Sequence, residues 1–170
     1  MTRQSRIAAL LLLALCQAPA IGAEPATAPA ANPEINAPYR DPDVERWKFV
    51  FENPNREVFD QRFRITQALG LVPGLRVADI GAGTGFFSLL FARAVGPEGK
   101  VYAVDIADNF LADIRRRAAD EYHVDNLETL RNDQTTTGLA PASVNLVFLC
   151  DTYHHFEQPA AMLASIAEAL

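Results

Sequence analysis

Apolar residues along the chain fall into short continuous runs, separated by longer segments with helical periodicity. The short runs predict buried β-strands, at Arg76–Ile80, Val101–Asp105, Leu127–Leu130 and Val144–Cys150. The other segments predict helices, at Phe86–Val95, from Asp108 to Tyr122 and from Gln158 to the end of the chain. Such alternation of strand and helix is typical of a parallel sheet with helices on both faces. The sequence therefore predicts an α/β fold.

Two further helices are predicted before the first strand. Asp41 or Asp43 can cap the first helix, whose apolar positions are Val44, Trp47 and either Val50 or Phe51. Asn55 can cap a longer second helix, which Gly70 and the turn at Pro73 and Gly74 end. The apolar residues of this second helix lie on or near one face, at Val58, Phe59, Phe63, Ile65 and Leu69. Stripes of this kind predict packing against the core.

The first 23 residues have the pattern of a secretory signal peptide. Arg3 and Arg6 precede the apolar stretch Ile7–Cys16, and small residues follow. This stretch is too short for a transmembrane helix, which needs about 20 residues. Cleavage after Ala20 or Ala23 is expected, followed by export to the periplasm. An uncleaved N-terminal anchor is the alternative.

The remaining chain divides into a linker and one domain. Residues 24–38 are rich in Ala and Pro and show no periodicity, which predicts an extended or disordered linker. Residues 39–170 have the length of a single domain. Apolar residues make up 49% of the 170-residue chain, enough for a hydrophobic core.

Charge and cysteine content exclude several classes of partner and site. The formal net charge is −6, and without Arg3 and Arg6 the chain carries 13 basic and 21 acidic residues. Nucleic acids and anionic lipids require basic patches, so neither is an expected partner, and no membrane span is expected after signal cleavage. Cys150, the one cysteine after the signal peptide, predicts a small core residue, with a reactive thiol as the alternative. No Cys/His cluster suggests a metal site.

A glycine-rich loop joins the first strand to the following helix. Gly81, Gly83 and Gly85 allow a ligand to approach the backbone closely, next to the amides at the helix N-terminus. Asp79 precedes the loop and suits a ligand that carries an ammonium or sulfonium group. Asp105 ends the second strand, where a carboxylate can accept both hydroxyls of a ribose. The loop therefore predicts a nucleoside-containing ligand with a positive charge.

The spacing of the loop argues against a nicotinamide dinucleotide. In the dinucleotide fingerprint the third glycine falls one position later, where this chain has Phe86. Asp79 would also repel a pyrophosphate. A nicotinamide-dependent oxidoreductase is therefore a disfavoured alternative.

The motifs "VADIGAGTG" and "VYAVDI" together resemble those of class I S-adenosylmethionine-dependent methyltransferases, in the small-molecule, type 11-like branch. The resemblance implies a Rossmann-like sheet and methyl transfer from S-adenosylmethionine (SAM). It implies that Asp79 and the glycines contact the methionine part, that Asp105 holds the ribose and that Ile106 packs on adenine. Asp133, after Asn132, resembles the acidic residue that binds the adenine amino group. A turn-capping role is the alternative for Asp133.

The segment "CDTYHHFEQP" follows the fourth strand and should face the methyl acceptor, because ligands of open α/β sheets bind at the carboxyl ends of the strands. His154 and His155 could act as a base or only orient the acceptor; a purely structural role is the alternative. Asp151 and Tyr153 are expected to line the pocket. In related enzymes, helices before the first strand close over the cofactor, and the candidates here are Tyr39, Trp47, Arg56 and Phe59. Core packing is the favoured role for Trp47 and Phe59.

The resemblance covers about residues 39–170 but only the cofactor-binding half of the fold. The full family fold has a seven-stranded sheet of order 3-2-1-4-5-7-6, and this sequence supplies strands one to four. We therefore expect the chain to be part of a longer exported methyltransferase, with strands five to seven missing. The alternative is a non-catalytic SAM-binding module.

Overall fold

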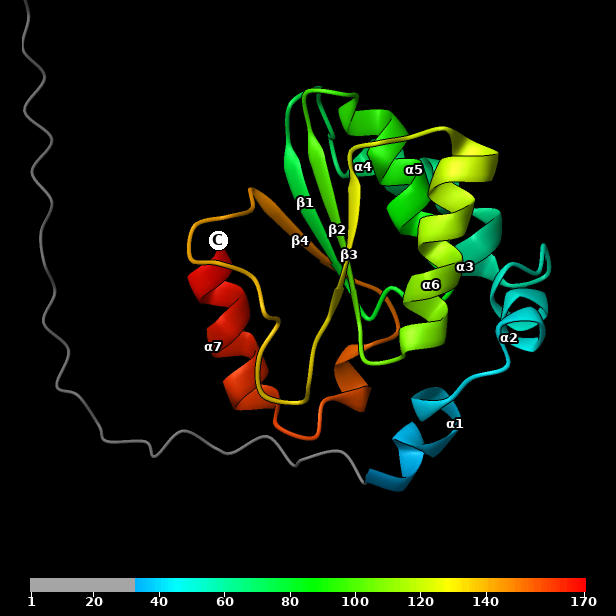
Figure 1. Ribbon diagram of the computed structural model, residues 1–170, viewed down its shortest axis with the longest axis vertical. Coiled ribbons are helices and arrows are strands. Elements are labelled where there is room, and N and C mark those ends of the chain that lie inside the picture. The colour runs from blue at the N-terminus through cyan, green and yellow to red at the C-terminus, as the bar shows by residue number, and fades with distance from the viewer. Residues whose placement is uncertain (1–32) are drawn as a thin grey trace, which may run out of the picture.

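A computed structural model of the chain describes residues 33–170 (Figure 1). The predicted signal peptide and residues 24–32 of the predicted linker lie outside this range. The described part begins with short helical elements: the 3-10 helix η1 (Pro33–Asn36), then α1 (Ala37–Arg40), α2 (Val44–Phe51), α3 (Glu57–Asp60) and α4 (Arg62–Ala68).

Four parallel strands form one sheet with the order β3-β2-β1-β4. These are β1 (Arg76–Ile80), β2 (Lys100–Asp105), β3 (Leu127–Arg131) and β4 (Leu146–Leu149). Their register places Val77 of β1 beside Val101 of β2 and Leu146 of β4. The helices between and after them are α5 (Phe86–Val95), α6 (Asp108–Arg117), the π-helical turn η2 (Ala118–Tyr122), the 3-10 turn η3 (Tyr153–His155) and α7 (Pro159–Ala169). The predicted α/β fold with a parallel sheet is confirmed.

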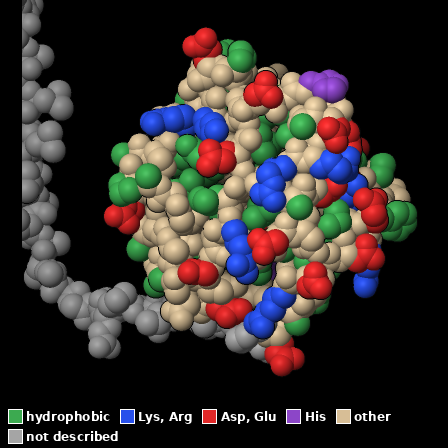
Figure 2. Space-filling view, viewed as in Figure 1, with side chains coloured by type: hydrophobic (Ala, Val, Ile, Leu, Met, Phe, Trp, Pro, Cys, Tyr) green, Lys and Arg blue, Asp and Glu red, His purple; other side chains and the backbone are tan. Residues whose placement is uncertain are grey.

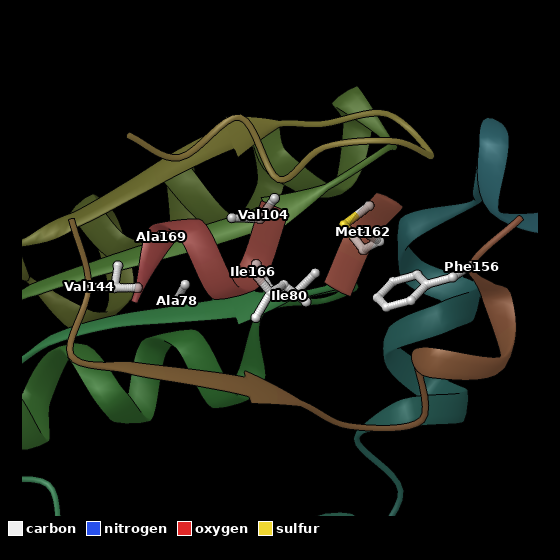
Figure 3. Close-up of a cluster of buried hydrophobic side chains, with 8 residues drawn as sticks. All are labelled: Ala78, Ile80, Val104, Val144, Phe156, Met162, Ile166 and Ala169. Carbon is white, nitrogen blue, oxygen red and sulfur yellow. The ribbon is translucent and has the colours of Figure 1, made fainter. Parts of the chain in front are cut away.

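Each face of the sheet is covered by its own hydrophobic cluster. On one face, side chains of β1 and β2 pack against α7 (Figure 3) through Ala78, Ile80, Val104, Val144, Phe156, Met162, Ile166 and Ala169. On the other face, Val77 and Val101 pack against the aromatic side chains of α5. Figure 1 shows α7 on one side of the sheet and α4, α5 and α6 on the other. Alternate apolar residues of β1 thus point into different clusters, Val77 into one and Ala78 and Ile80 into the other.

The N-terminal helices differ in detail from the prediction. Asp43 caps α2 as expected, since its side chain accepts a hydrogen bond from the amide of Arg46. The single long helix expected from Asn55 is instead divided into α3 and α4 at Gln61, and Arg56 rather than Asn55 precedes it. Phe63 is 60% exposed, so its predicted core role is wrong. The end of the predicted linker, Pro33–Pro38, is helical rather than extended.

Two later elements are shorter than expected. The helix that starts at Asp108 leaves α-helical geometry after Arg117 and ends in a π-helical turn, with His123 in the left-handed region. The strand expected at Val144–Cys150 is confined to β4, because the amide of Val144 donates to the carbonyl of Ala169 at the end of α7. Cys150 lies just after β4 rather than within it; it is partly buried and packs against the core cluster on the α5 face.

The surface agrees with the charge balance of the sequence. In Figure 2, Lys and Arg side chains alternate with Asp and Glu side chains and form no large patch of one sign on this face. Within residues 33–170, no helix combines the length and apolar character needed to cross a membrane. Over the same residues, no three or more His, Cys, Asp and Glu side chains are grouped as a metal site would require.

Candidate functional site

A cavity of about 330 Å³ opens at the carboxyl ends of the strands. This volume lies within the range of small-molecule sites, about 300–1,000 Å³. The part of its lining that ends the strands and opens the loops includes Asp79, Gly81, Gly83, Asp105, Ile106 and Asp133. Ile80, Phe156 and Met162 of the cluster in Figure 3 give it an apolar wall. Residues predicted from separate motifs are therefore brought together in one cavity.

The glycine loop lies between β1 and α5. Gly81 has a φ of +73°, and a Cβ there would lie 2.9 Å from Cβ of Thr152 and closer still to the rest of that side chain. Gly85, also in the left-handed region, does not line the cavity; a Cβ there would overlap Ile114 of α6. Gly81 therefore lets Thr152 pack closely against the loop, whereas Gly85 lets α6 pack closely against the start of α5.

Two buried carboxylates end β1 and β2 beside this loop. Asp79 is 3% exposed and accepts a 2.6 Å hydrogen bond from the hydroxyl of Ser88. Asp105 is 7% exposed, and its two oxygens accept hydrogen bonds from the amides of Gly83 and Ala107, at 2.8 and 2.9 Å. Burial raises the pKa of both carboxyls, and the pKa of Asp79 reaches about 7 because the charge of Asp105 adds to the effect. Such a pair favours a ligand that brings positive charge and hydroxyl donors.

Asp133 caps a turn and also lines the cavity. Its Oδ1 accepts hydrogen bonds from the amide and hydroxyl of Thr135 and from the amide of Thr136, which makes a turn. The hydrogen bonds from Thr135 hold the pKa of Asp133 below its usual value. None of these three bonds uses Oδ2, and Asp133 lines the cavity next to Asn132. The residue therefore shapes the turn and also presents an ionised carboxylate to the cavity.

The residues that the sequence predicted to face a methyl acceptor lie after β4. Asp151, His154 and His155 line the cavity. Asp151, in the left-handed region, forms an ion pair with Arg56 from the loop before α3. Tyr153 is 47% exposed, packs edge-on against Phe156 and does not line the cavity, so the structure does not place it where the sequence predicted.

Helices before the first strand cover this end of the cavity. Tyr39 and Arg56 line it, as expected. Trp47 does not, but its ring lies 4.7 Å from that of Tyr39 and 4.8 Å from that of Phe51, measured between centroids. Phe59 packs edge-on against Phe86 behind the wall. These contacts form a cover in which two of the four candidates reach the cavity directly.

Several lining residues were missed by the sequence prediction. Asn36 is 2% exposed and contacts His155, although it falls in the segment predicted to be a linker. Thr152 fills the space beside Gly81, and Phe51 was assigned only to helix packing. Cys150 also lines the cavity; burial raises the pKa of its thiol to about 11, so the thiol is protonated at neutral pH. A buried Asn at the end of an Ala/Pro-rich segment carries no periodic signal that could have identified it.

The fold and cavity define an α/β protein with a candidate small-molecule site at the switch point of its sheet, which lies between β1 and β4. The sequence profile of a family described as "Methyltransferase domain" matches residues 77–170. This match covers more than half of the chain, so the chain belongs to this methyltransferase family.

Individual relatives match shorter segments. The ubiquinone/menaquinone biosynthesis C-methyltransferase UbiE of Teredinibacter turnerae is 41% identical over 64 residues, covering 38% of this chain and 26% of that protein. The UbiE protein of Burkholderia vietnamiensis is 44% identical over 59 residues, covering 35% and 24%. The matches thus span about a quarter of the length of these curated relatives.

Solved structures agree with the fold. A SAM-dependent methyltransferase from Aquifex aeolicus superposes with a TM-score of 0.66 and 25% identity, covering 76% of this chain and 68% of that one. A methyltransferase from Geobacter sulfurreducens, in complex with S-adenosyl-L-homocysteine, has a TM-score of 0.58 and 20% identity, covering 77% and 52%. The second likeness concerns the fold alone.

Proposed function

We propose that this chain binds SAM in the cavity and serves the transfer of its methyl group to a small molecule. The observation that carries the proposal is the pair of buried carboxylates, Asp79 and Asp105, which end β1 and β2 beside the glycine loop and line the cavity. A ligand with an ammonium group and a ribose complements this arrangement. Membership of the methyltransferase family supports the same ligand.

The residues present fit the parts of SAM. Each oxygen of Asp105 accepts one backbone amide and keeps a second lone pair, so the carboxylate can also accept the two ribose hydroxyls. Asp79, with a pKa raised to about 7, is stabilised in its charged form by the ammonium of the methionine part. Oδ2 of Asp133 is the acceptor proposed for the adenine amino group, and Ile106 is the side chain proposed to pack on the ring.

When bound, SAM supplies an electrophilic methyl group, whose bond to sulfur breaks with the electron pair remaining on sulfur while the acceptor bonds to the carbon. The chain contributes alignment and exclusion of water. The cover reaches the acceptor end of the cavity through Tyr39 and Arg56, and the ion pair of Arg56 with Asp151 connects it to the loop after β4. His154 and His155 are the candidate proton acceptors there.

A small-molecule acceptor is supported by the similarity to proteins named as quinone-biosynthesis methyltransferases. The dimensions of the cavity and its aromatic lining suit such a molecule. We also propose that the protein is exported to the periplasm and that this chain is part of a longer methyltransferase. N-terminal sequencing of the protein purified from its native host tests export, which predicts a mature chain that starts after Ala20 or Ala23.

The binding proposal is tested by calorimetric titration of the full chain with SAM and, separately, with a nicotinamide dinucleotide. SAM should bind stoichiometrically and the dinucleotide should not. Asp105→Ala removes hydrogen bonds to a charged acceptor, each worth about 1.5–3 kcal/mol, so SAM affinity should fall by at least about 100-fold. Asp120→Ala, at an exposed aspartate of the turn after α6, is the matched control and should leave the affinity unchanged.

Selective binding of the dinucleotide would overturn the proposed ligand, and so would unchanged SAM affinity in Asp105→Ala. Methyl transfer is then assayed as formation of S-adenosylhomocysteine with a panel of small phenols, quinols and amines. Tight SAM binding without turnover on any of them would favour a SAM-binding module over an enzyme.

A further inference from the structure

Asn36 lies buried between the N-terminal segment and the loop after β4. Its Nδ2 donates hydrogen bonds to the carbonyl of His155 at 3.0 Å and to Oε1 of Glu157 at 2.9 Å. Both partners can only accept, so they fix which end of the Asn36 amide is the NH₂ group. Oδ1 of Asn36 therefore faces Nδ1 of His155, at 3.0 Å.

This orientation determines the tautomer of the His155 ring. An amide oxygen can only accept, so Nδ1 of His155 must carry the hydrogen that it donates to Asn36. In the neutral ring the other nitrogen, Nε2, then has a free lone pair. A neutral histidine side chain in water prefers the opposite tautomer, with the hydrogen on Nε2. The contact with Asn36 thus turns the ring into a base whose lone pair is at Nε2.

The surroundings keep this ring neutral near pH 7. His155 is half-buried, and its pKa is lowered by burial and by the neighbouring His154, whose ring centroid is 4.2 Å away. Asp151 acts in the opposite direction but is itself paired with Arg56. Tyr39 packs edge-on against the ring.

The negative charge of Glu157, the second partner of the Asn36 amide, is also balanced. Glu157, which accepts from Asn36, forms an ion pair with Arg40 at 3.7 Å. His155 and Asn36 both line the cavity, on its acceptor side. A neutral imidazole with a defined lone pair is therefore present where an acceptor would lie.

We infer that Asn36 is a positioning residue that holds His155 as a base with its lone pair at Nε2, and that the methyl acceptor is a molecule that must lose a proton, from oxygen or from an acidified carbon. The inference rests on the proposed methyl transfer. The proton of the acceptor goes to Nε2, and the electron pair that it leaves forms the bond to the methyl carbon. Acceptors that lose no proton, such as tertiary amines and thioethers, do not need this base.

The tautomer is tested without SAM or turnover, by long-range ¹H–¹⁵N NMR of the full chain. The sequence contains three histidines, and His155→Gln assigns the signals of His155. Near pH 7.5 the wild type should show a protonated Nδ1 and an unprotonated Nε2. In Asn36→Ala the proton should shift towards Nε2. A wild-type ring with its proton on Nε2 would overturn the inference.

A matched control separates positioning from stability. Asn126 is also a buried asparagine, whose Nδ2 donates to the carbonyls of Ala92 and Gly96 away from the cavity. Asn126→Ala should lower stability as Asn36→Ala does but leave the His155 tautomer unchanged. If both variants altered the His155 signals equally, the effect would be a general loosening of the fold, and the positioning role would be excluded.

The kinetic test uses any acceptor that is turned over. Asn36→Ala should reduce kcat about tenfold or more with little change in KM, as expected for a weakened base. Asn36→Asp places a carboxylate opposite Nδ1, which should raise the pKa of His155 and move the acid limb of the kcat/KM profile upward by about one unit. Turnover only of acceptors that lose no proton, unaffected by His155→Gln, would overturn the inference. Failure of the proposed function would instead appear as absence of SAM binding in the titration.

Discussion

At the scale of single residues, the cavity concentrates ionisable groups whose properties depend on burial. Asp79 has its pKa raised mainly by the loss of water, while the hydrogen bond from Ser88 opposes the rise. A buried carboxyl of this kind is protonated at mildly acidic pH and ionised above neutrality. Because the proposed ligand brings an ammonium group, it should bind the ionised form. Binding and proton release at Asp79 should therefore be coupled.

SAM affinity should fall as pH decreases through about 7. With a pKa of about 7, about a tenth of Asp79 is ionised at pH 6 and most of it at pH 7.5, so affinity should differ by roughly tenfold between these values. Calorimetry at pH 6.5 in buffers of different ionisation enthalpy should show proton release on binding. Asp79→Asn should bind SAM weakly and lose both the pH dependence and the proton release. Equal affinity at pH 6 and 7.5 in the wild type would contradict this assignment.

The ligand-free protein should respond to pH in the opposite direction. The folded-state pKa of Asp79 lies above its ordinary value of 3.8, so the folded state binds the proton more tightly than the unfolded state. This stabilisation is fully present below about pH 3.8 and is lost as pH rises through about 7. Ser88→Ala removes the opposing hydrogen bond and should move the upper end of this range to higher pH.

At the scale of elements, the sequence predicted best those segments whose signal is local. The bounds of β1 and α5 agree with the prediction, because one is a short, mainly apolar run that ends at Gly81 and the other lies between Gly85 and Gly96. The carboxylates Asp79 and Asp105 could be predicted for the same reason, since a strand end and a glycine loop fix their positions.

Elements stabilised by distant contacts were predicted less well. The helical form of Pro33–Asn36 accompanies hydrogen bonds from Asn36 to residues about 120 positions later, which no local pattern can indicate. Likewise, β4 is shorter than its apolar run because the amide of Val144 bonds to the end of α7. The split between α3 and α4 also follows no capping signal around Gln61.

The close fit of the glycine loop gives a prediction at this scale. Gly81→Ala combines the cost of a left-handed backbone with an overlap with Thr152, whereas Gly70→Ala has a similar φ of +62° and nothing within 4 Å of the added Cβ. Urea unfolding should show a loss of about 1–2 kcal/mol for Gly70→Ala and about 2–4 kcal/mol for Gly81→Ala. Thr152→Ala should recover part of the extra loss. An equal effect of the two alanine substitutions would show that the loop is not tightly packed against Thr152.

At the scale of the whole molecule, a buried ion pair ties the N-terminal cover to the sheet. Arg117 of α6 is 5% exposed and donates to both carboxylate oxygens of Glu52, at 2.8 and 3.1 Å, just after α2. The same guanidinium donates to the carbonyl of Thr84 in the glycine loop. The cover, the α6 side of the sheet and the ligand loop are thus joined by one side chain.

This arrangement predicts that the cover unfolds together with the sheet only while Arg117 is present. Trp47, the single tryptophan of the chain, lies in α2, so its fluorescence reports on the cover, whereas far-UV circular dichroism reports on the whole fold. In the wild type the two urea transitions should coincide. In Arg117→Met, which leaves Glu52 without its partner, the fluorescence transition should shift to lower urea by the equivalent of roughly 2–3 kcal/mol, ahead of the dichroism transition.

Arg116→Gln, at an exposed arginine of the same helix that pairs with Asp113 and Glu121, should leave both transitions nearly unchanged. If the two probes moved together in Arg117→Met, the ion pair would stabilise the fold as a whole, and the cover would be held to the sheet by its aromatic packing instead.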